Sequence, residues 1–235
     1  MPSWEELAEL YEAAWSDPLL HSAETGGKID HLATAFAQEV NRTTAHESLD
    51  GLQILDFGAG RGAAMQAMMR AGAEVVGVEP FGFTRLRKLG LNAYAALEEI
   101  PSSSLPFDGI VCYDVVEHLL EPETLLVSLR QLLKPGGWLI VATPNARSLR
   151  ARARGSVWKE ARKAGHVVLF APAGLDVMLR RAGYADVRRL RWMVVYSDSV
   201  TRRTVHTLLQ LTGLDGELRM IGWAPASATQ RRHAP

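Results

Sequence analysis

The sequence predicts an α/β fold with a mostly parallel seven-stranded sheet and helices on both faces. Three observations support this prediction. Short apolar runs alternate with helical segments from about residue 52 onward, and such alternation produces a parallel sheet covered on both faces. The first apolar run, 52–57, passes through a glycine turn into a helical segment. The segment 217–223 is predicted to be a final strand antiparallel to the preceding one.

The elements follow one another in a regular order. Lys134-Pro135-Gly136-Gly137 is expected to end a helix and turn into a buried strand, because proline and glycine follow the last helical turn. The strands are predicted near residues 52–57, 74–79, 91–95, 107–113, 137–143, 187–196 and 217–223, and the helices near 62–71, 82–89, 122–133 and 172–182.

The N-terminal segment 1–48 precedes this alternation. It shows apolar residues at helical spacing, interrupted at Asp17-Pro18 and Gly26-Gly27. We expect it to form a helical cap over the active site. One domain is then expected over 49–224, with a lid insertion at 146–169. The small, polar and basic residues 225–235 are expected to form a flexible tail.

The composition limits the class of protein. The chain has 235 residues, of which 26 are basic and 26 acidic, and this length suits one domain with a sizeable core. A hydrophobic content of 47% excludes wholesale disorder. Neither a membrane-spanning run nor a signal-peptide core is present in the sequence. Cys112 is the single cysteine and cannot form an internal disulfide. Together these features predict a cytoplasmic protein.

The glycine turn after the first predicted strand indicates a ligand site. Gly58, Gly60 and Gly62 allow a sharp turn and a close approach of the ligand. The helix that follows presents free backbone N–H groups. Gly58, Gly60 and Ala63, with Glu79 further on, also satisfy a dinucleotide pattern. The glycines alone therefore do not choose between ligands.

Asp56 decides between the two ligand classes. A carboxylate two residues before the first glycine would repel a pyrophosphate in a cleft of low dielectric constant. It suits a ligand that is positively charged and lacks phosphate, such as S-adenosylmethionine. Glu79, at the end of the next strand, would accept both ribose hydroxyls. In the alternative interpretation Asp56 only caps the helix and Glu79 is a solvated strand end.

Four blocks in a fixed order resemble the class I S-adenosylmethionine-dependent methyltransferases. Within this family, Asp114-x-x-Glu117-His118 and the later Gly165-His166 look most like the ubiquinone-biosynthesis O-methyltransferase branch. The resemblance covers roughly residues 52–196 and implies the Rossmann-like form of the predicted sheet. The blocks are Leu55–Gly62, Val76–Pro80, Phe107–His118 and Leu133–Asn145.

The cofactor is expected beyond the carboxyl ends of the strands, where ligands bind in open sheets of this kind. Asp56 and the glycine turn would hold its methionine moiety and Glu79 its ribose, while Phe81 and Leu97 would flank the adenine. The full predicted set is Asp56, Gly58, Ala59, Gly60, Gly62, Glu79, Pro80, Phe81, Leu97, Tyr113, Asp114 and His118.

The Asp114 block leaves two chemical roles open. Asp114 shares a helical face with Glu117 and with His118 by spacing, and His166 would join them from a distant loop. In the resembling branch such residues can bind a divalent cation that orients a diol, so a metal site of Asp114, Glu117, His118 and His166 is possible. Alternatively His118, His166 and Asp114 are catalytic, with a histidine as general base. A third interpretation makes them structural residues beside the site.

The acceptor side is less defined by sequence. The predicted acceptor is a small molecule methylated at a hydroxyl oxygen. The basic segment Arg147–Lys163 is predicted to cover its pocket and to favour an anionic or carrier-linked acceptor. RNA or another macromolecule is the alternative acceptor, disfavoured for nucleic acid by the balanced charge. A silent cofactor-binding scaffold is the non-enzyme alternative. The sequence does not predict an oligomeric state.

Overall fold

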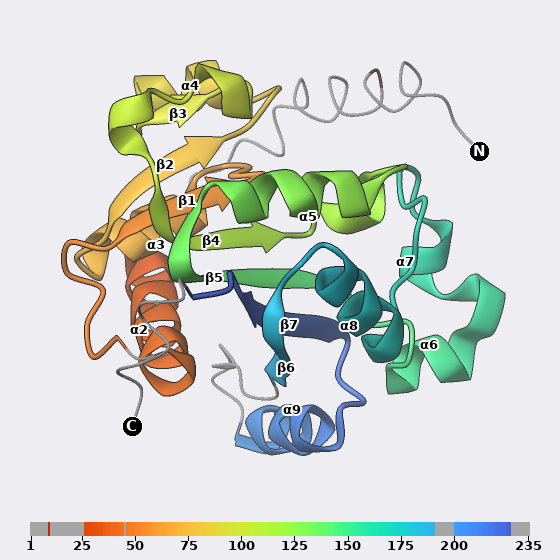
Figure 1. The fold of residues 1–235 in the computed structure, drawn as a ribbon. Helices are drawn as coiled ribbons and strands as arrows, with labels where there is room; N and C mark the ends of the chain where they lie inside the picture. Colours follow the sequence, from red (N-terminus) through yellow and green to blue (C-terminus); the bar gives the residue numbers. More distant parts are fainter. Residues whose placement is uncertain (1–8, 10–25, 45, 191–199, 227–235) are drawn as a thin grey trace.

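The computed structural model describes residue 9 and residues 26–44, 46–190 and 200–226. Its centre is one seven-stranded sheet in the order β3-β2-β1-β4-β5-β7-β6, shown in Figure 1. Neighbouring strands are parallel except at β7, which is antiparallel to both β5 and β6. The strands are β1 (Gln53–Phe57), β2 (Glu74–Val78), β3 (Ala93–Tyr94), β4 (Phe107–Tyr113), β5 (Leu133–Pro144), β6 (Ala185–Leu190) and β7 (Glu217–Trp223). The predicted Rossmann-like, mostly parallel sheet is confirmed.

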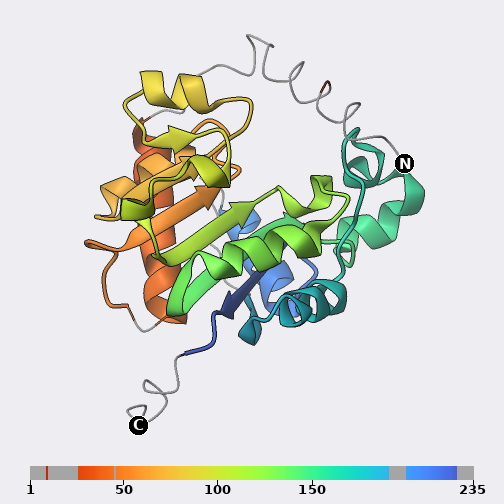
Figure 2. The same cartoon turned by 45° about the horizontal axis from the view of Figure 1, so that its top comes forward.

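Helices cover both faces of the sheet, as predicted (Figures 1 and 2). Ile54 and Leu55 are successive residues of β1, and their side chains enter separate cores because side chains alternate along a strand. One core is completed by α5 (Pro122–Gln131) and α8 (Pro172–Arg181). The other is completed by α2 (Gly26–Thr43), α3 (Ala63–Arg70) and α4 (Phe83–Lys88).

The region between β5 and α8 is not an irregular loop. It contains two short helices, α6 (Leu149–Arg154) and α7 (Lys159–Arg162), joined by the 3₁₀ turn η5 (Gly155–Val157). Ser148 begins α6 by accepting a hydrogen bond from the Ala151 N–H at 3.1 Å. Further 3₁₀ turns are η2 (Leu97–Glu99), η3 (Ser102–Ser104) and η4 (Val116–His118).

Two details differ from the sequence prediction. Helix α5 ends at Gln131 and β5 begins at Leu133, so the predicted turn at 134–137 lies inside a strand. The register between β4 and β5 shifts there, and this shift absorbs the extra residues. Helix α9 (Val200–Thr212) lies between β6 and β7 and was not predicted.

Some predicted segments fall outside the described residues. Of the expected N-terminal cap, the structure describes residues 9, 26–44 and 46–48, and α2 packs into the core through Phe36 and Val40. The strand predicted to extend to 196 is described only to Leu190, and the expected tail only to residue 226. The predicted domain boundaries therefore stay a prediction. Within the part of the chain that is described, none of the helices is long and apolar enough to cross a bilayer.

Candidate active site

The glycine turn joins β1 to α3 across the end of β2. Gly58, Gly60 and Gly62 have φ values of 78°, 52° and 79°, which L-residues rarely adopt. The N–H groups of Gly58 and Ala59 both donate to the Val78 carbonyl, at 2.9 and 3.1 Å. A side chain at Gly58 would also collide with Val115. The turn is therefore fixed against the ends of β2 and β4.

Two buried carboxyl groups lie together beneath this turn. Asp56 is 2% exposed and Glu79 is 7% exposed. Glu79 accepts hydrogen bonds from the Gly60 N–H at 2.9 Å and the Phe81 N–H at 3.3 Å. Burial raises the pKa of Glu79, and these backbone donors lower it. Glu79 is thus fastened to the glycine turn rather than solvated.

The burial of Asp56 is offset less than that of Glu79, by one backbone hydrogen bond. Burial first, and the neighbouring Glu79 second, raise the pKa of Asp56 to about 7, while a hydrogen bond from the Met65 N–H lowers it. Its Oδ2 has no hydrogen-bond partner among the described residues. One oxygen of Asp56 therefore makes the helix-capping contact that was considered as the alternative, through the Met65 N–H. The other oxygen fits a positively charged ligand group, and an anionic ligand would add a third charge.

Other residues predicted to bind the cofactor lie on the neighbouring segments. Phe81, with 38% exposure, follows Pro80 between β2 and α4, and Leu97 begins η2. Tyr113 ends β4, but the Arg219 guanidinium lies 4.8 Å from the centre of its ring. The Tyr113 hydroxyl is buried and makes no hydrogen bond within the described structure. Its cofactor contact stays a prediction.

The turn η4 brings three predicted site residues together after β4. The Glu117 carbonyl accepts hydrogen bonds from the Val167 and Val168 N–H groups at 2.9 and 3.2 Å. These bonds attach the end of the lid region to η4. As a result, the rings of His118 and His166 stand edge to face, with centroids 4.6 Å apart.

Glu117, His118 and His166 form a possible metal site. Each offers a ligand atom, and these atoms lie within 4.8 Å of one another. The Nδ1 of His118 lies 2.9 Å from the Gly165 carbonyl, and the Nδ1 of His166 lies 3.0 Å from the Glu160 carbonyl. Each Nδ1 must therefore carry a proton, which leaves the lone pair on Nε2.

Two of the possible ligand atoms of this site, one on Glu117 and one on His166, lack partners among the described residues. Glu117 is 1% exposed; its Oε2 accepts from the Thr143 hydroxyl at 2.9 Å, but its Oε1 accepts no bond from any described residue. The His166 side chain is 0% exposed, and its Nε2 is likewise unpartnered in the described structure. Burial raises the pKa of Glu117 to about 7 and lowers that of His166 to about 4. One carboxylate and two imidazoles fit a divalent transition metal or magnesium.

Asp114, the fourth predicted ligand, is not part of this group. Its backbone is left-handed, with φ 53°, and its N–H donates to the Ala142 carbonyl at 2.9 Å. Since η4 is a short 3₁₀ turn rather than an α-helix, the spacing argument that joined Asp114 to the histidines does not apply. Asp114 instead lies exposed in the wall of a cavity.

This cavity of about 460 Å³ opens beyond the carboxyl ends of β4 and β5. Of the predicted basic lid, Arg150 and Lys163 line it, whereas Arg147, Arg152 and Arg154 do not. Four carboxyl groups line it as well, so the lining does not support the predicted preference for an anion. The lining residues are Asp114, Glu117, Pro144, Arg150, Trp158, Glu160, Lys163, His206, Gly216 and Glu217.

The sequence analysis missed His206 and Glu217. His206 lies on α9, and Glu217 begins β7, opposite Pro144. Neither belongs to a motif. The only available signal was the antiparallel final strand, which would place its first residue at the carboxyl end of β5.

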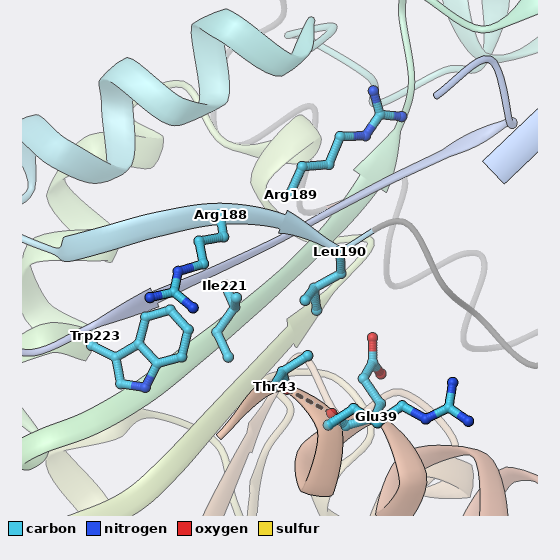
Figure 3. Close-up of a pocket in the computed structure, with 8 residues that line it drawn as sticks. Glu39, Thr43, Arg188, Arg189, Leu190, Ile221 and Trp223 are labelled. Atoms are coloured by element: carbon cyan, nitrogen blue, oxygen red, sulfur yellow. Dashed lines mark hydrogen bonds between the residues drawn. The ribbon is translucent and has the colours of Figure 1, made fainter. Parts of the chain in front are cut away.

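A second cavity of about 270 Å³ lies between α2 and the strands β6 and β7 (Figure 3), of which β6 is the edge strand. There the Arg188 guanidinium lies 5.2 Å from the centre of the Trp223 ring. Trp223 pairs with Trp138 in the first half of β5. The cavity extends from this position to Arg189 and Leu190 at the end of β6, and it does not include the strand ends that carry Asp56, Glu79 and Glu117.

The strand order, the antiparallel β7 and the glycine turn after Asp56 define a class I S-adenosylmethionine-dependent methyltransferase domain. The sequence model of the family described as "Methyltransferase domain" matches residues 29–189, and the chain belongs to that family. The predicted family and the predicted enzyme class, an S-adenosylmethionine-dependent methyltransferase, are thereby confirmed.

Curated relatives cover part of this domain. The chain is 34% identical over 128 residues to a ubiquinone biosynthesis O-methyltransferase of Roseobacter denitrificans, covering 50% of this chain and 52% of that protein. The corresponding protein of Agrobacterium fabrum is 35% identical over 136 residues, covering 54% of each. The chain thus spans about half the length of the curated relatives it matches. A solved methyltransferase from Archaeoglobus fulgidus, at 21% identity and a TM-score of 0.54, covers 81% of this chain and 94% of its own and supports the fold alone.

Proposed function

We propose that this protein transfers a methyl group from S-adenosylmethionine to a hydroxyl oxygen of a small molecule, with a divalent cation beside the acceptor. The observation that carries the proposal is the Glu117–His118–His166 group, of which Glu117 lines the acceptor cavity. The buried Oε1 of Glu117 and Nε2 of His166 have no hydrogen-bond partner among the described residues. The O-methyltransferase relatives support transfer to oxygen.

The chain's own residues would hold the cofactor through its charges. In this proposal Asp56 accepts from the ammonium group of the methionine moiety. Glu79, whose carboxylate is already oriented by Gly60 and Phe81, accepts from the ribose hydroxyls. The glycine turn lets the backbone approach the ligand closely. Phe81 and Leu97 flank the adenine.

Methyl transfer needs an acceptor oxygen in line with the sulfonium and a place for its proton. Glu117, His118 and His166 would hold the cation, which would orient the acceptor hydroxyl and lower its pKa, so that the hydroxyl proton would pass to solvent water before the methyl group is transferred. A general base requires a single imidazole. Two imidazoles and a carboxylate that converge are better explained as a ligand set. Trp158 and the lid helices would exclude water from the cavity.

The test is an assay of methyl transfer to a neutral catechol, 3,4-dihydroxybenzyl alcohol, in which the released S-adenosylhomocysteine is measured. Activity should disappear with a chelator and return with added Mg²⁺, Mn²⁺ or Zn²⁺. Calorimetric binding of S-adenosylhomocysteine should be unchanged by the chelator. Activity that persists in the chelator would reject the metal and favour a histidine base. Absence of S-adenosylhomocysteine binding would reject the proposed function itself.

A further inference from the structure

Carboxyl groups outnumber fixed cations in the acceptor cavity. Asp114, Glu117, Glu160 and Glu217 line it together with Arg150 and Lys163. Two of these acids have a lysine nearby, because Lys163 lies close enough to lower the pKa of both Asp114 and Glu117. The Glu160 carboxylate lies 3.8 Å from the Nδ1 of His166, but this imidazole is neutral at pH 7 because its pKa is lowered to about 4. Glu217 remains to be explained.

The cation next to Glu217 is shared with another carboxylate. Arg219 Nε lies 2.9 Å from Glu217 Oε1 in an ion pair, but this contact does not have hydrogen-bond geometry. Arg219 Nη1 instead donates to both oxygens of Glu39, at 2.7 and 2.6 Å. Glu39 is buried and extends from α2 toward the sheet, as Figure 3 shows. One buried guanidinium therefore faces two carboxylates.

This arrangement leaves negative charge at the cavity wall. Burial raises the pKa of Glu217, and the nearby acids Asp114 and Glu39 raise it further, against the opposing influence of Arg219. The Glu217 side chain is 37% exposed, so its carboxylate can reach a ligand in the cavity. A ligand that brings positive charge would offset the repulsion among these neighbouring acids.

One further polar group on this wall lacks a partner. The buried Nδ1 of His206, from α9, lines the same cavity and is unpartnered in the described structure. An ammonium group has three donors and no acceptor, so carboxylate and imidazole acceptors suit it.

We infer that the acceptor carries a protonated amino group in addition to its hydroxyl, and that Glu217 binds this ammonium group. The inference rests on the proposed function, which places the hydroxyl at Glu117, His118 and His166. Glu217 stands on β7, opposite Pro144 at the end of β5, so it contacts another part of the acceptor. Glu217 is then a specificity-determining residue, and Arg219 and Glu39 are positioning residues.

Three catechols that differ in one substituent test the inference. They are 3,4-dihydroxybenzylamine, 3,4-dihydroxybenzyl alcohol and 3,4-dihydroxybenzoate, titrated into protein saturated with S-adenosylhomocysteine and Mg²⁺. The amine should bind at least tenfold more tightly than the alcohol, and the acid more weakly than both. Equal affinities, no detectable binding of the amine, or tighter binding of the acid would overturn the inference. This ranking needs no variant.

A matched pair of variants assigns the effect to Glu217. Glu217→Gln keeps the size and removes the charge, and it should bring the amine to within threefold of the alcohol. Glu74→Gln is the control, because Glu74 is exposed at the start of β2 and does not line the cavity. An amine preference that survives Glu217→Gln would contradict the assignment. Unchanged S-adenosylhomocysteine affinity in both variants would show that only the acceptor side has changed.

Discussion

Replacing Asp56 with Asn should stabilise the empty protein while weakening cofactor binding. Burial and Glu79 raise the pKa of Asp56 from 3.8 to about 7. Between these two values the folded state binds more protons than the unfolded state, so the stability of the empty wild type falls as pH rises through that window. A shift of about three pKa units, at ~1.4 kcal/mol each, means that the ionised Asp56 lowers the unfolding free energy of the empty protein by at most about 4 kcal/mol at pH 8.

The Asn side chain is uncharged and keeps one oxygen for the Met65 N–H. Urea unfolding of Asp56→Asn without cofactor should therefore give a higher unfolding free energy than wild type at pH 8, and a smaller difference at pH 4. Calorimetry should show roughly 10- to 100-fold weaker S-adenosylhomocysteine binding, the scale of a lost charge-assisted hydrogen bond. In wild type, affinity should fall as pH drops below about 7, because Asp56 then binds a proton in the empty protein.

The opposite result would refute this reasoning. If Asp56→Asn destabilised the empty protein at pH 8 and bound S-adenosylhomocysteine like wild type, Asp56 would be a structural helix cap. Wild-type affinity that stayed constant from pH 8 to pH 5.5 would lead to the same conclusion.

Three further predictions concern separate parts of the site. Glu79→Gln should weaken S-adenosylhomocysteine binding by about 1–3 kcal/mol in calorimetry, with Glu74→Gln as the control because Glu74 is exposed at the start of β2; equal affinities of Glu79→Gln and wild type would show that Glu79 does not hold the ribose. Glu117→Gln should abolish metal-dependent methyl transfer but leave S-adenosylhomocysteine affinity unchanged, and retained activity would exclude Glu117 as a ligand. Arg150→Ala should tighten binding of 3,4-dihydroxybenzylamine a few-fold at low salt, because a like charge leaves the cavity rim. Arg152→Ala should not change this affinity, since Arg152 does not line the cavity. If the two variants bound the amine equally, the effect of Arg150→Ala would be one of general surface charge.

The sequence predicted those parts of the site that adjoin one strand end. Asp56 and Glu79 follow buried strands whose carboxyl ends must meet in a parallel sheet, so their proximity followed from topology. Glu117, His118 and the distant His166 came from the resemblance. The inclusion of Asp114 relied on α-helical spacing, which the 3₁₀ turn η4 and the left-handed Asp114 backbone do not have.

Contacts made by β7 could not be predicted in this way. Glu39 and Arg219 are 180 residues apart, and they meet because an antiparallel strand inserts between β5 and β6. Strand register depends on packing across the whole sheet rather than on a local motif. For the same reason, the charge of the acceptor cavity could not be inferred from the arginines of 147–163. Of those arginines, Arg150 lines the cavity and the others do not.

The most direct test of the account is a crystal structure of the protein with S-adenosylhomocysteine and Mn²⁺, using anomalous scattering to locate the metal. The account predicts a manganese peak among Glu117, His118 and His166. It also predicts the cofactor's ammonium group at Asp56, its ribose on Glu79 and its sulfur facing the 460 Å³ cavity. Manganese bound elsewhere, or a cofactor sulfur that faces away from this cavity, would contradict it.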